Sequence, residues 1–138
     1  MNRRGFLGVA ASGLLAACAS LVTTPVTPVD GRVRLAVRNY PSLDRPGGSL
    51  KIRPDGSDRV LYVLRMDDGA FTVVSPICKH RGCTVDVEGA ALVCPCHGSM
   101  YGRDGRVLRG PTQAPLDRFP ATLTTHGELI IQLDGTPT

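Results

Sequence analysis

Cysteine and histidine are concentrated in one short stretch of the sequence, residues 78–101. Four of the five cysteines and two of the three histidines in the 138-residue chain lie there. They form a Cys-x-His loop at residues 78–80 and a Cys-x-x-His loop at residues 94–97, and each loop carries one further cysteine. Because each loop can supply one thiolate and one imidazole, the spacing predicts a metal centre held between two loops.

Zinc fits these ligands, since it commonly binds two cysteines and two histidines, so a zinc ribbon is one interpretation. It leaves Cys83 and Cys96 without a role. Residues 1–22, described below, resemble an export signal, and exported free thiols beside a metal site would be poorly protected. If these two cysteines pair with each other, they tie the two loops together. Such a disulfide would close about 14 residues and contribute roughly 3 kcal/mol on the chain-entropy model.

The full sequences of the two loops, CKHRGC at residues 78–83 and CPCHGSMY at residues 94–101, closely resemble those of the Rieske [2Fe–2S] proteins. The resemblance covers roughly residues 32–133, and its double motif is specific. It implies one [2Fe–2S] cluster as the cofactor, with two cysteines on one iron and two histidines on the other. By position the ligands would be Cys78, His80, Cys94 and His97, and the disulfide linking the loops would join Cys83 and Cys96.

The resemblance also implies roles for residues around the cluster. In the family, the serine matching Ser99 donates a hydrogen bond to a bridging sulfide, and the tyrosine matching Tyr101 donates to a ligand cysteine. If each hydroxyl contributes on the order of 1–2 kcal/mol, each raises the reduction potential by about 40–90 mV, which predicts a high-potential cluster. The alternative is that both are ordinary polar loop residues. The segment 110–115 matches the proline loop that covers the cluster, with Gly110, Pro111 and Pro115 as its marker residues.

Two positions of the first loop depart from the family pattern. Quinol-oxidising members usually carry Thr and Leu where this chain has Lys79 and Arg81. The basic tip favours docking to an acidic redox partner, such as a cytochrome or an oxidase subunit, and charge at such a contact mainly sets the rate of encounter. A quinol is the alternative partner, and solvated loop charge without a docking role is the alternative interpretation.

The elements that must position these loops are short strands. Apolar Val33, Leu35 and Val37 alternate with polar or small residues, which predicts a strand with one buried face. Further strands and hairpins are predicted at residues 50–52, 60–66, 71–75, 84–87, 90–93, 101–108, 119–125 and 128–133, and no helix is predicted. The fold class is therefore all-β. The resemblance makes it a Rieske fold over residues 32–135, a sandwich-like base of antiparallel sheets with an inserted cluster-binding subdomain, about residues 76–115, of two loops and a proline loop.

Residues 1–22 have the features of an export signal. Arg3 and Arg4, followed by an uncharged run at residues 5–22, resemble a twin-arginine signal. The tetrapeptide LAAC ending at Cys18 looks like a lipoprotein processing box, which would make Cys18 a lipidated membrane anchor. An uncleaved transmembrane anchor and plain cleavage are the alternatives, and all three place the domain in the periplasm. Residues 23–31 are expected to be an extended Pro/Thr tether, either a swivel or a mere connector.

Composition and motifs argue against several classes of function. The formal net charge of +4 is mild and no basic stripe is interleaved with aromatic residues, which argues against nucleic-acid binding. No substrate-pocket motif or Ser/His/Asp arrangement is visible, so we expect an electron-transfer component of an oxidoreductase rather than a stand-alone enzyme. The leading hypothesis is one-electron transfer in a quinol–cytochrome complex or an arsenite-oxidase-type enzyme. The alternatives are the ferredoxin component of an oxygenase and a non-catalytic scaffold.

Overall fold

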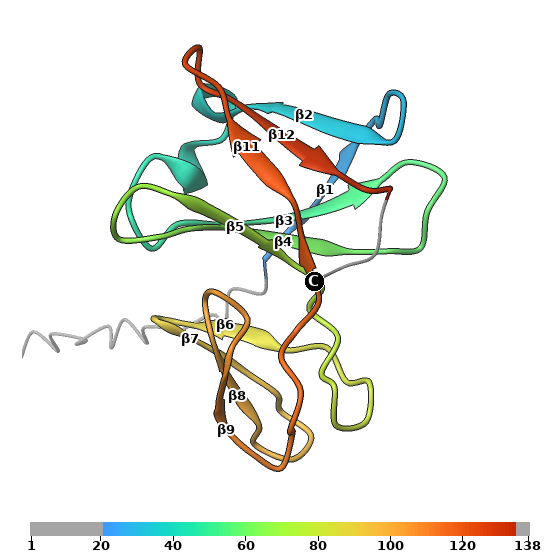
Figure 1. The fold of residues 1–138 in the computed structure, drawn as a ribbon, viewed down its shortest axis with the longest axis vertical. Helices are drawn as coiled ribbons and strands as arrows, with labels where there is room; N and C mark the ends of the chain where they lie inside the picture. Colours follow the sequence, from blue (N-terminus) through green and yellow to red (C-terminus); the bar gives the residue numbers. More distant parts are fainter. Residues whose placement is uncertain (1–20, 135–138) are drawn as a thin grey trace, which may run out of the picture.

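The computed structural model describes residues 21–134, which form an all-β structure of two stacked lobes (Figure 1). Within that range the helical elements are two 3-10 turns, η1 (Val37–Asn39) and η2 (Pro41–Leu43). The strands are β1 (Thr23–Val26), β2 (Arg32–Ala36), β3 (Ser49–Pro54), β4 (Leu61–Arg65), β5 (Phe71–Val74), β6 (Asp86–Glu88), β7 (Ala91–Val93), β8 (Met100–Gly102), β9 (Val107–Arg109), β10 (Arg118–Phe119), β11 (Ala121–Leu123) and β12 (Glu128–Gln132). The all-β class expected from the sequence is confirmed.

The larger lobe, the base, consists of two sheets around an apolar core. One sheet has five strands in the order β1-β3-β4-β5-β10, and the other has three in the order β11-β12-β2. The alternation predicted for β2 is present, because Val33 and Leu35 are buried while Arg34 is exposed. Antiparallel pairing with β12 sets Leu35 opposite Leu129. Cross-strand apolar pairs of this kind close the core from the side of the smaller sheet.

Strand β4 contributes to both lobes of the molecule. Four consecutive residues, Leu61 to Leu64, are buried, which a strand achieves only when both of its faces are covered. Leu61 and Val63 pack into the core of the base. Tyr62 and Leu64 point the other way, into the core of the second lobe. The five-stranded sheet is therefore the wall between two cores.

The smaller lobe, the cluster lobe, is an antiparallel meander in the order β6-β7-β8-β9. It is inserted between β5 and β10 and lies beneath the base in Figure 1. Strands β5 and β10 pair with each other, with Val74 opposite Arg118 and Val73 opposite Phe119. The chain thus leaves the base and returns to it at neighbouring positions, and everything between carries the two Cys/His loops and the proline segment.

The segment 23–31 is not the free tether expected from the sequence. Thr23–Val26 is strand β1, which pairs in parallel with β3 at the edge of the five-stranded sheet. Val26 is buried, and its carbonyl accepts a hydrogen bond from the Asp55 N–H at 2.8 Å. The β-branched residues favour a strand, and an edge position tolerates Pro25 because one side of an edge strand needs no donor. The prediction of a swivel is therefore wrong for this part of the chain.

The predicted strand 119–125 is divided at Pro120. Strand β10 pairs with β5 in the large sheet, whereas β11 pairs with β12 in the small sheet. Proline cannot donate to a ladder, and it interrupts the pairing here. Its carbonyl still accepts a hydrogen bond from the Gln132 N–H at 2.9 Å. The chain therefore changes sheets at a point where the sequence pattern shows one continuous strand.

Arg103 fastens the cluster lobe to the base. It is only 8% exposed, although it lies in the turn between β8 and β9. Its guanidinium donates to the carbonyl oxygens of Gly48 and Gly89, and to Ser49 Oγ at 3.0 Å. Burial lowers the pKa of Arg103, while the charge of Asp67 opposes that shift. One buried cation thus joins the turn before β3 in the base to the β6–β7 turn of the cluster lobe.

The predicted signal over residues 1–22 falls almost wholly outside the described residues, and Arg3, Arg4 and Cys18 all lie there. Within residues 21–134, no helix is long and apolar enough to cross a membrane.

Candidate metal centre

The two Cys/His loops have the same backbone construction. In the first loop the Gly82 N–H donates to the Cys78 carbonyl at 2.9 Å, and the Cys78 N–H donates to the Cys83 carbonyl at 2.7 Å. In the second loop Gly98 donates to Cys94 at 3.0 Å, and Cys94 donates to Ser99 at 2.8 Å. Both glycines adopt a positive φ, +80° and +76°, a backbone conformation that residues with a side chain rarely adopt. The glycine four residues after the first cysteine therefore closes each loop.

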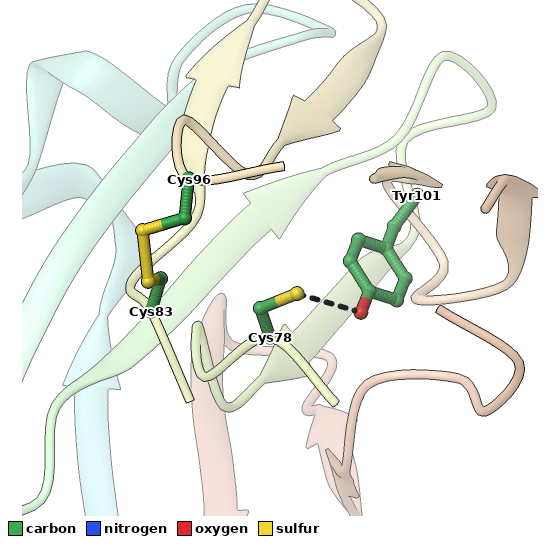
Figure 2. The surroundings of a disulfide bond; sticks show 4 residues. All are labelled: Cys78, Cys83, Cys96 and Tyr101. Atoms are coloured by element: carbon green, nitrogen blue, oxygen red, sulfur yellow. Dashed lines mark hydrogen bonds between the residues drawn. A yellow bond between two sulfur atoms is a disulfide. The ribbon is translucent and has the colours of Figure 1, made fainter. Parts of the chain in front are cut away.

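A disulfide between Cys83 and Cys96 connects the tips of the two loops (Figure 2). Its Cα atoms lie 6.5 Å apart, and the bridge spans 13 positions of the sequence. This is the disulfide implied by the Rieske resemblance. The Sγ atom of Cys94 lies within 4.8 Å of both bridged sulfur atoms. Because Cys83 and Cys96 are bonded to each other, neither can act as a thiolate ligand, so this trio of sulfurs is not a metal site by itself.

Cys78 and Cys94 are the two thiols without a disulfide partner in the described chain, and both are buried. Burial by itself raises the pKa of the Cys78 thiol, but hydrogen bonds outweigh it and the net pKa is lowered. The hydrogen-bonding groups are the Tyr101 hydroxyl, the backbone at His80, and the side chains of Cys94 and Ser99. These groups favour the thiolate, which is the form that binds metals. The site is therefore arranged for an anionic sulfur at Cys78.

The two histidines are neighbours in space and lie on the same two loops as these thiols. The ring centroids of His80 and His97 are 4.7 Å apart and the rings are nearly perpendicular, at 87°. His97 is exposed and His80 is half-buried. The Nδ1 atom of His80 is buried and has no hydrogen-bond partner among the described residues. A buried polar atom normally has a partner, so this nitrogen is free to act as a metal ligand. All four predicted ligand residues are thus brought to one end of the cluster lobe.

Ser99 and Tyr101, the residues predicted to tune the potential, are both completely buried. The Tyr101 hydroxyl points toward Cys78 Sγ (Figure 2), at a distance of 3.3 Å, and it accepts a hydrogen bond from the Lys79 N–H at 3.0 Å. Burial and the neighbouring Cys78 sulfur raise the pKa of Tyr101, while its hydrogen bonds with the Thr112 side chain and the Lys79 backbone act in the opposite direction. The phenol therefore stays protonated and keeps a proton to donate beside the sulfur.

The predicted proline loop, residues 110–115, lies between β9 and β10 and closes over the two hydroxyls. Gly110, Pro111 and Pro115 are exposed, and the loop is held by residues that no motif identified. Thr112 is buried and its N–H donates to Ser99 Oγ at 3.1 Å. Leu116 packs into the core of the cluster lobe, and its N–H donates to the Gly105 carbonyl at 2.9 Å. No sequence signal marks Thr112, because its importance depends on how the loop folds back.

Lys79 and Arg81, predicted to form a docking surface, differ in their surroundings. Lys79 Nζ forms an ion pair with Asp117 Oδ2 at 2.7 Å, which joins the first loop to the chain just after the proline loop. Arg81 is exposed and makes no ion pair within the described residues. Asp117 was not identified from the sequence, because an acid 38 positions away gives no local signal. Lys79 therefore contributes to the internal structure of the site as well as to its surface.

Comparison with known proteins decides the family. The Rieske [2Fe–2S] domain matches residues 35–120, which is more than half of the chain and includes both loops and the proline loop. The chain belongs to the Rieske family. The family domain binds one [2Fe–2S] cluster, which agrees with the cofactor predicted from the two loops. Two buried free thiols and a partnerless buried imidazole nitrogen are donors that fit such a cluster.

Several known proteins are similar to this chain, over different shares of their length. The cytochrome b6-f complex iron–sulfur subunit of Chlorobaculum tepidum is 32% identical over 140 residues, which covers 96% of this chain and 76% of that protein. The menaquinol:cytochrome c reductase iron–sulfur subunit of Geobacillus thermodenitrificans is 40% identical over 67 residues, 44% of this chain and 40% of that protein. Among solved structures, the plasma membrane Rieske protein of Synechocystis has 27% identity and a TM-score of 0.54, and the match covers 62% of this chain and 86% of that chain.

Proposed function

We propose that the protein transfers single electrons through one [2Fe–2S] cluster, as the Rieske subunit of a quinol-oxidising cytochrome complex. The observation that carries the proposal is the meeting of two buried free thiols with two adjacent imidazoles at one end of the cluster lobe. The similarity over almost the whole chain to a cytochrome b6-f subunit supports this kind of complex. Cys78 and Cys94 would hold one iron, and His80 and His97 the other.

The cluster, when bound, supplies a site that accepts and releases one electron. The chain supplies the remaining control. Ser99 and Tyr101 present hydroxyl groups in a buried setting, where hydrogen bonds to sulfur stabilise the more negative, reduced state. The disulfide holds the two loops together, and the exposed His97 ring gives a partner access to the edge of the site. We infer a potential in the upper part of the range of Rieske centres.

Binding of the cluster by these four residues can be tested on the full chain expressed with iron and sulfide. Wild type should show the electron paramagnetic resonance spectrum of a reduced Rieske centre and one cluster per chain. Cys78→Ser and His97→Ala should lose it, whereas His126→Ala, a change at an exposed histidine in the β11–β12 turn, should retain it. A normal spectrum in either ligand variant would refute the assignment of that residue.

We also propose that twin-arginine export and an anchor at Cys18 hold the domain at the periplasmic face of the membrane. The support is the sequence: paired arginines, an uncharged run and an LAAC box. Cells producing the full chain should show it in the membrane fraction, accessible from the periplasm. Replacing Arg3 and Arg4 by Lys should stop export, and Cys18→Ala should release the exported domain from the membrane. Membrane retention of the Cys18 variant would favour an uncleaved anchor instead.

Docking to an acidic redox protein is proposed to rely on Arg81 more than on Lys79. Arg81 is exposed, whereas Lys79 is held by Asp117 at 2.7 Å. Arg81→Glu should therefore slow electron transfer to an acidic cytochrome at low salt, and the difference from wild type should shrink as salt rises, since salt screens surface charge. Equal rates for Arg81→Glu and wild type at low salt would show that the basic tip is merely solvated.

A further inference from the structure

Thr112 is in contact with both hydroxyl groups that face the proposed cluster site. It is 4% exposed and lies on the proline loop. Its N–H donates to Ser99 Oγ at 3.1 Å, and its own hydroxyl oxygen accepts a hydrogen bond from the Tyr101 hydroxyl at 2.9 Å. The same Thr112 hydroxyl donates to the Ala114 carbonyl at 3.2 Å. One side chain of the loop thus connects Tyr101 to the backbone of the loop that covers it.

The Tyr101 hydroxyl has more acceptors around it than it has protons. A phenol carries one proton and can donate one hydrogen bond. Two acceptors are in reach, Thr112 Oγ1 at 2.9 Å and Cys78 Sγ at 3.3 Å. The phenol oxygen already accepts from the Lys79 N–H at 3.0 Å, which fixes its position. When Cys78 is a thiolate it can only accept, so Tyr101 cannot donate fully to both neighbours.

We propose that Thr112 is a positioning residue that controls whether the Tyr101 hydroxyl donates to Cys78. In the first arrangement Tyr101 donates to Thr112, and Thr112 donates to the Ala114 carbonyl. In the second arrangement both hydroxyls have rotated about their C–O bonds, so that Thr112 donates to Tyr101 and Tyr101 donates to Cys78 Sγ. No proton leaves its oxygen and no covalent bond changes. The inference rests on the proposed function, because it requires Cys78 to be a cluster ligand.

The two arrangements favour different redox states of the protein. Electron uptake increases the negative charge near Cys78 Sγ, and hydrogen bonds to a more negative acceptor are stronger, which favours the second arrangement. In the oxidised protein that charge is smaller, so we expect the first arrangement, which has the shorter contact to Thr112 and the additional bond to Ala114. Thr112 therefore stabilises the oxidised state and lowers the potential that Tyr101 alone would give.

The test is a redox titration of the full chain with its cluster bound, in which visible circular dichroism reports the ratio of reduced to oxidised protein. Thr112→Val removes the competing hydroxyl, so we expect the ratio of reduced to oxidised protein at a fixed applied potential to rise about fivefold, or about 40 mV for a one-electron couple. Thr112→Ser keeps the hydroxyl and should titrate like wild type. Thr122→Val, at an exposed threonine on β11, is the matched control and should also be unchanged.

A second background separates this effect from a general change in polarity. In a Tyr101→Phe chain there is no phenol hydroxyl to donate to either neighbour. Adding Thr112→Val should therefore leave the potential of the Phe variant unchanged. An equal shift in both backgrounds, or no rise with intact Tyr101, would overturn the proposal. Thr112→Ala carries the same expectation with less bulk and replaces the Val variant if that variant does not fold. Failure of the ligand assignment is seen separately, as a normal Rieske spectrum in Cys78→Ser.

Discussion

The two cores of the molecule share one sheet as a wall but are made of different kinds of residue. The core of the base consists of aliphatic side chains and one phenylalanine. The core of the cluster lobe includes two tyrosines and the two free cysteines, and buried Ser99 and Thr112 lie among them. Buried polar groups must find partners, so this lobe is held by directed hydrogen bonds and a disulfide in addition to apolar burial. Apolar packing thus stabilises the base, whereas buried polar groups and their hydrogen bonds build the metal site in the cluster lobe.

Leu61→Ala should show the difference between the two cores most clearly, because it should lower stability without changing the reduction potential. Leu61 is completely buried in the core of the base, and truncating such a residue costs about 2–5 kcal/mol of unfolding free energy. Molecules that remain folded should keep the wild-type potential, because the site lies in the other lobe. Urea unfolding and a redox titration measure the two effects. Leu123→Ala, at an exposed leucine on β11, should change stability by less than about 0.5 kcal/mol.

Removing the disulfide should affect the cluster lobe selectively. Replacing Cys83 and Cys96 together by Ser opens a link of 13 positions and should lower the unfolding free energy by roughly 3 kcal/mol. We also expect the loops to separate and the cluster to be lost, which bleaching of the visible absorbance would report. Retention of a stable cluster with unchanged absorbance would mean that the site holds together without the covalent link between the loops.

The connection between the lobes can be broken at Arg103. Arg103→Leu leaves the carbonyl oxygens of Gly48 and Gly89 without this donor, so we expect a loss of about 1–3 kcal/mol in thermal or urea unfolding. Arg106→Leu, whose exposed side chain pairs with Asp104 on the same turn, should lose less than about 1 kcal/mol. If both variants lost the same stability, the buried arginine would not be the fastening point.

The finest comparison uses two buried tyrosines of the cluster lobe. Tyr101→Phe removes the hydroxyl 3.3 Å from Cys78 Sγ, and we expect the potential to fall by about 40–90 mV. Ser99→Ala should lower it by a similar amount. Tyr62→Phe removes a hydroxyl that donates to the Val85 carbonyl at 2.8 Å, so stability should fall by about 1 kcal/mol with no change in potential. Equal potentials for all three variants and wild type would refute the proposed tuning.

The sequence predicted local features well and long-range ones poorly. Strands with clear alternation, such as β2, and the two Cys/His loops depend on neighbours a few positions apart, so their patterns are visible in the chain. Asp117 and Thr112 matter because of residues that folding brings to them from other loops. Arg103 resembles an ordinary solvated turn residue until the base covers it.

Two errors in the predicted fold have the same origin. Residues 23–26 were expected to be a tether because prolines and threonines favour extended chain, and extended chain is also what an edge strand requires. The strand expected at 119–125 has continuous β-propensity, but Pro120 divides it between two sheets. In both cases the conformation was predicted correctly and the pairing partner was not, because pairing is decided by the rest of the sheet.

The pairing of β5 with β10 has a consequence for how such a protein can be altered. The Ser75 N–H donates to the Asp117 carbonyl at 2.8 Å, which extends the contact between the two stems of the cluster lobe. Because the two stems lie next to each other, the cluster lobe can be replaced or lengthened without changing the path of the chain through the base. The five-stranded sheet would then select which modules are compatible, since Tyr62, Leu64 and Val74 must still be covered. The base is in this sense a general support, and the sheet face toward the cluster lobe sets the shape that any inserted module must match.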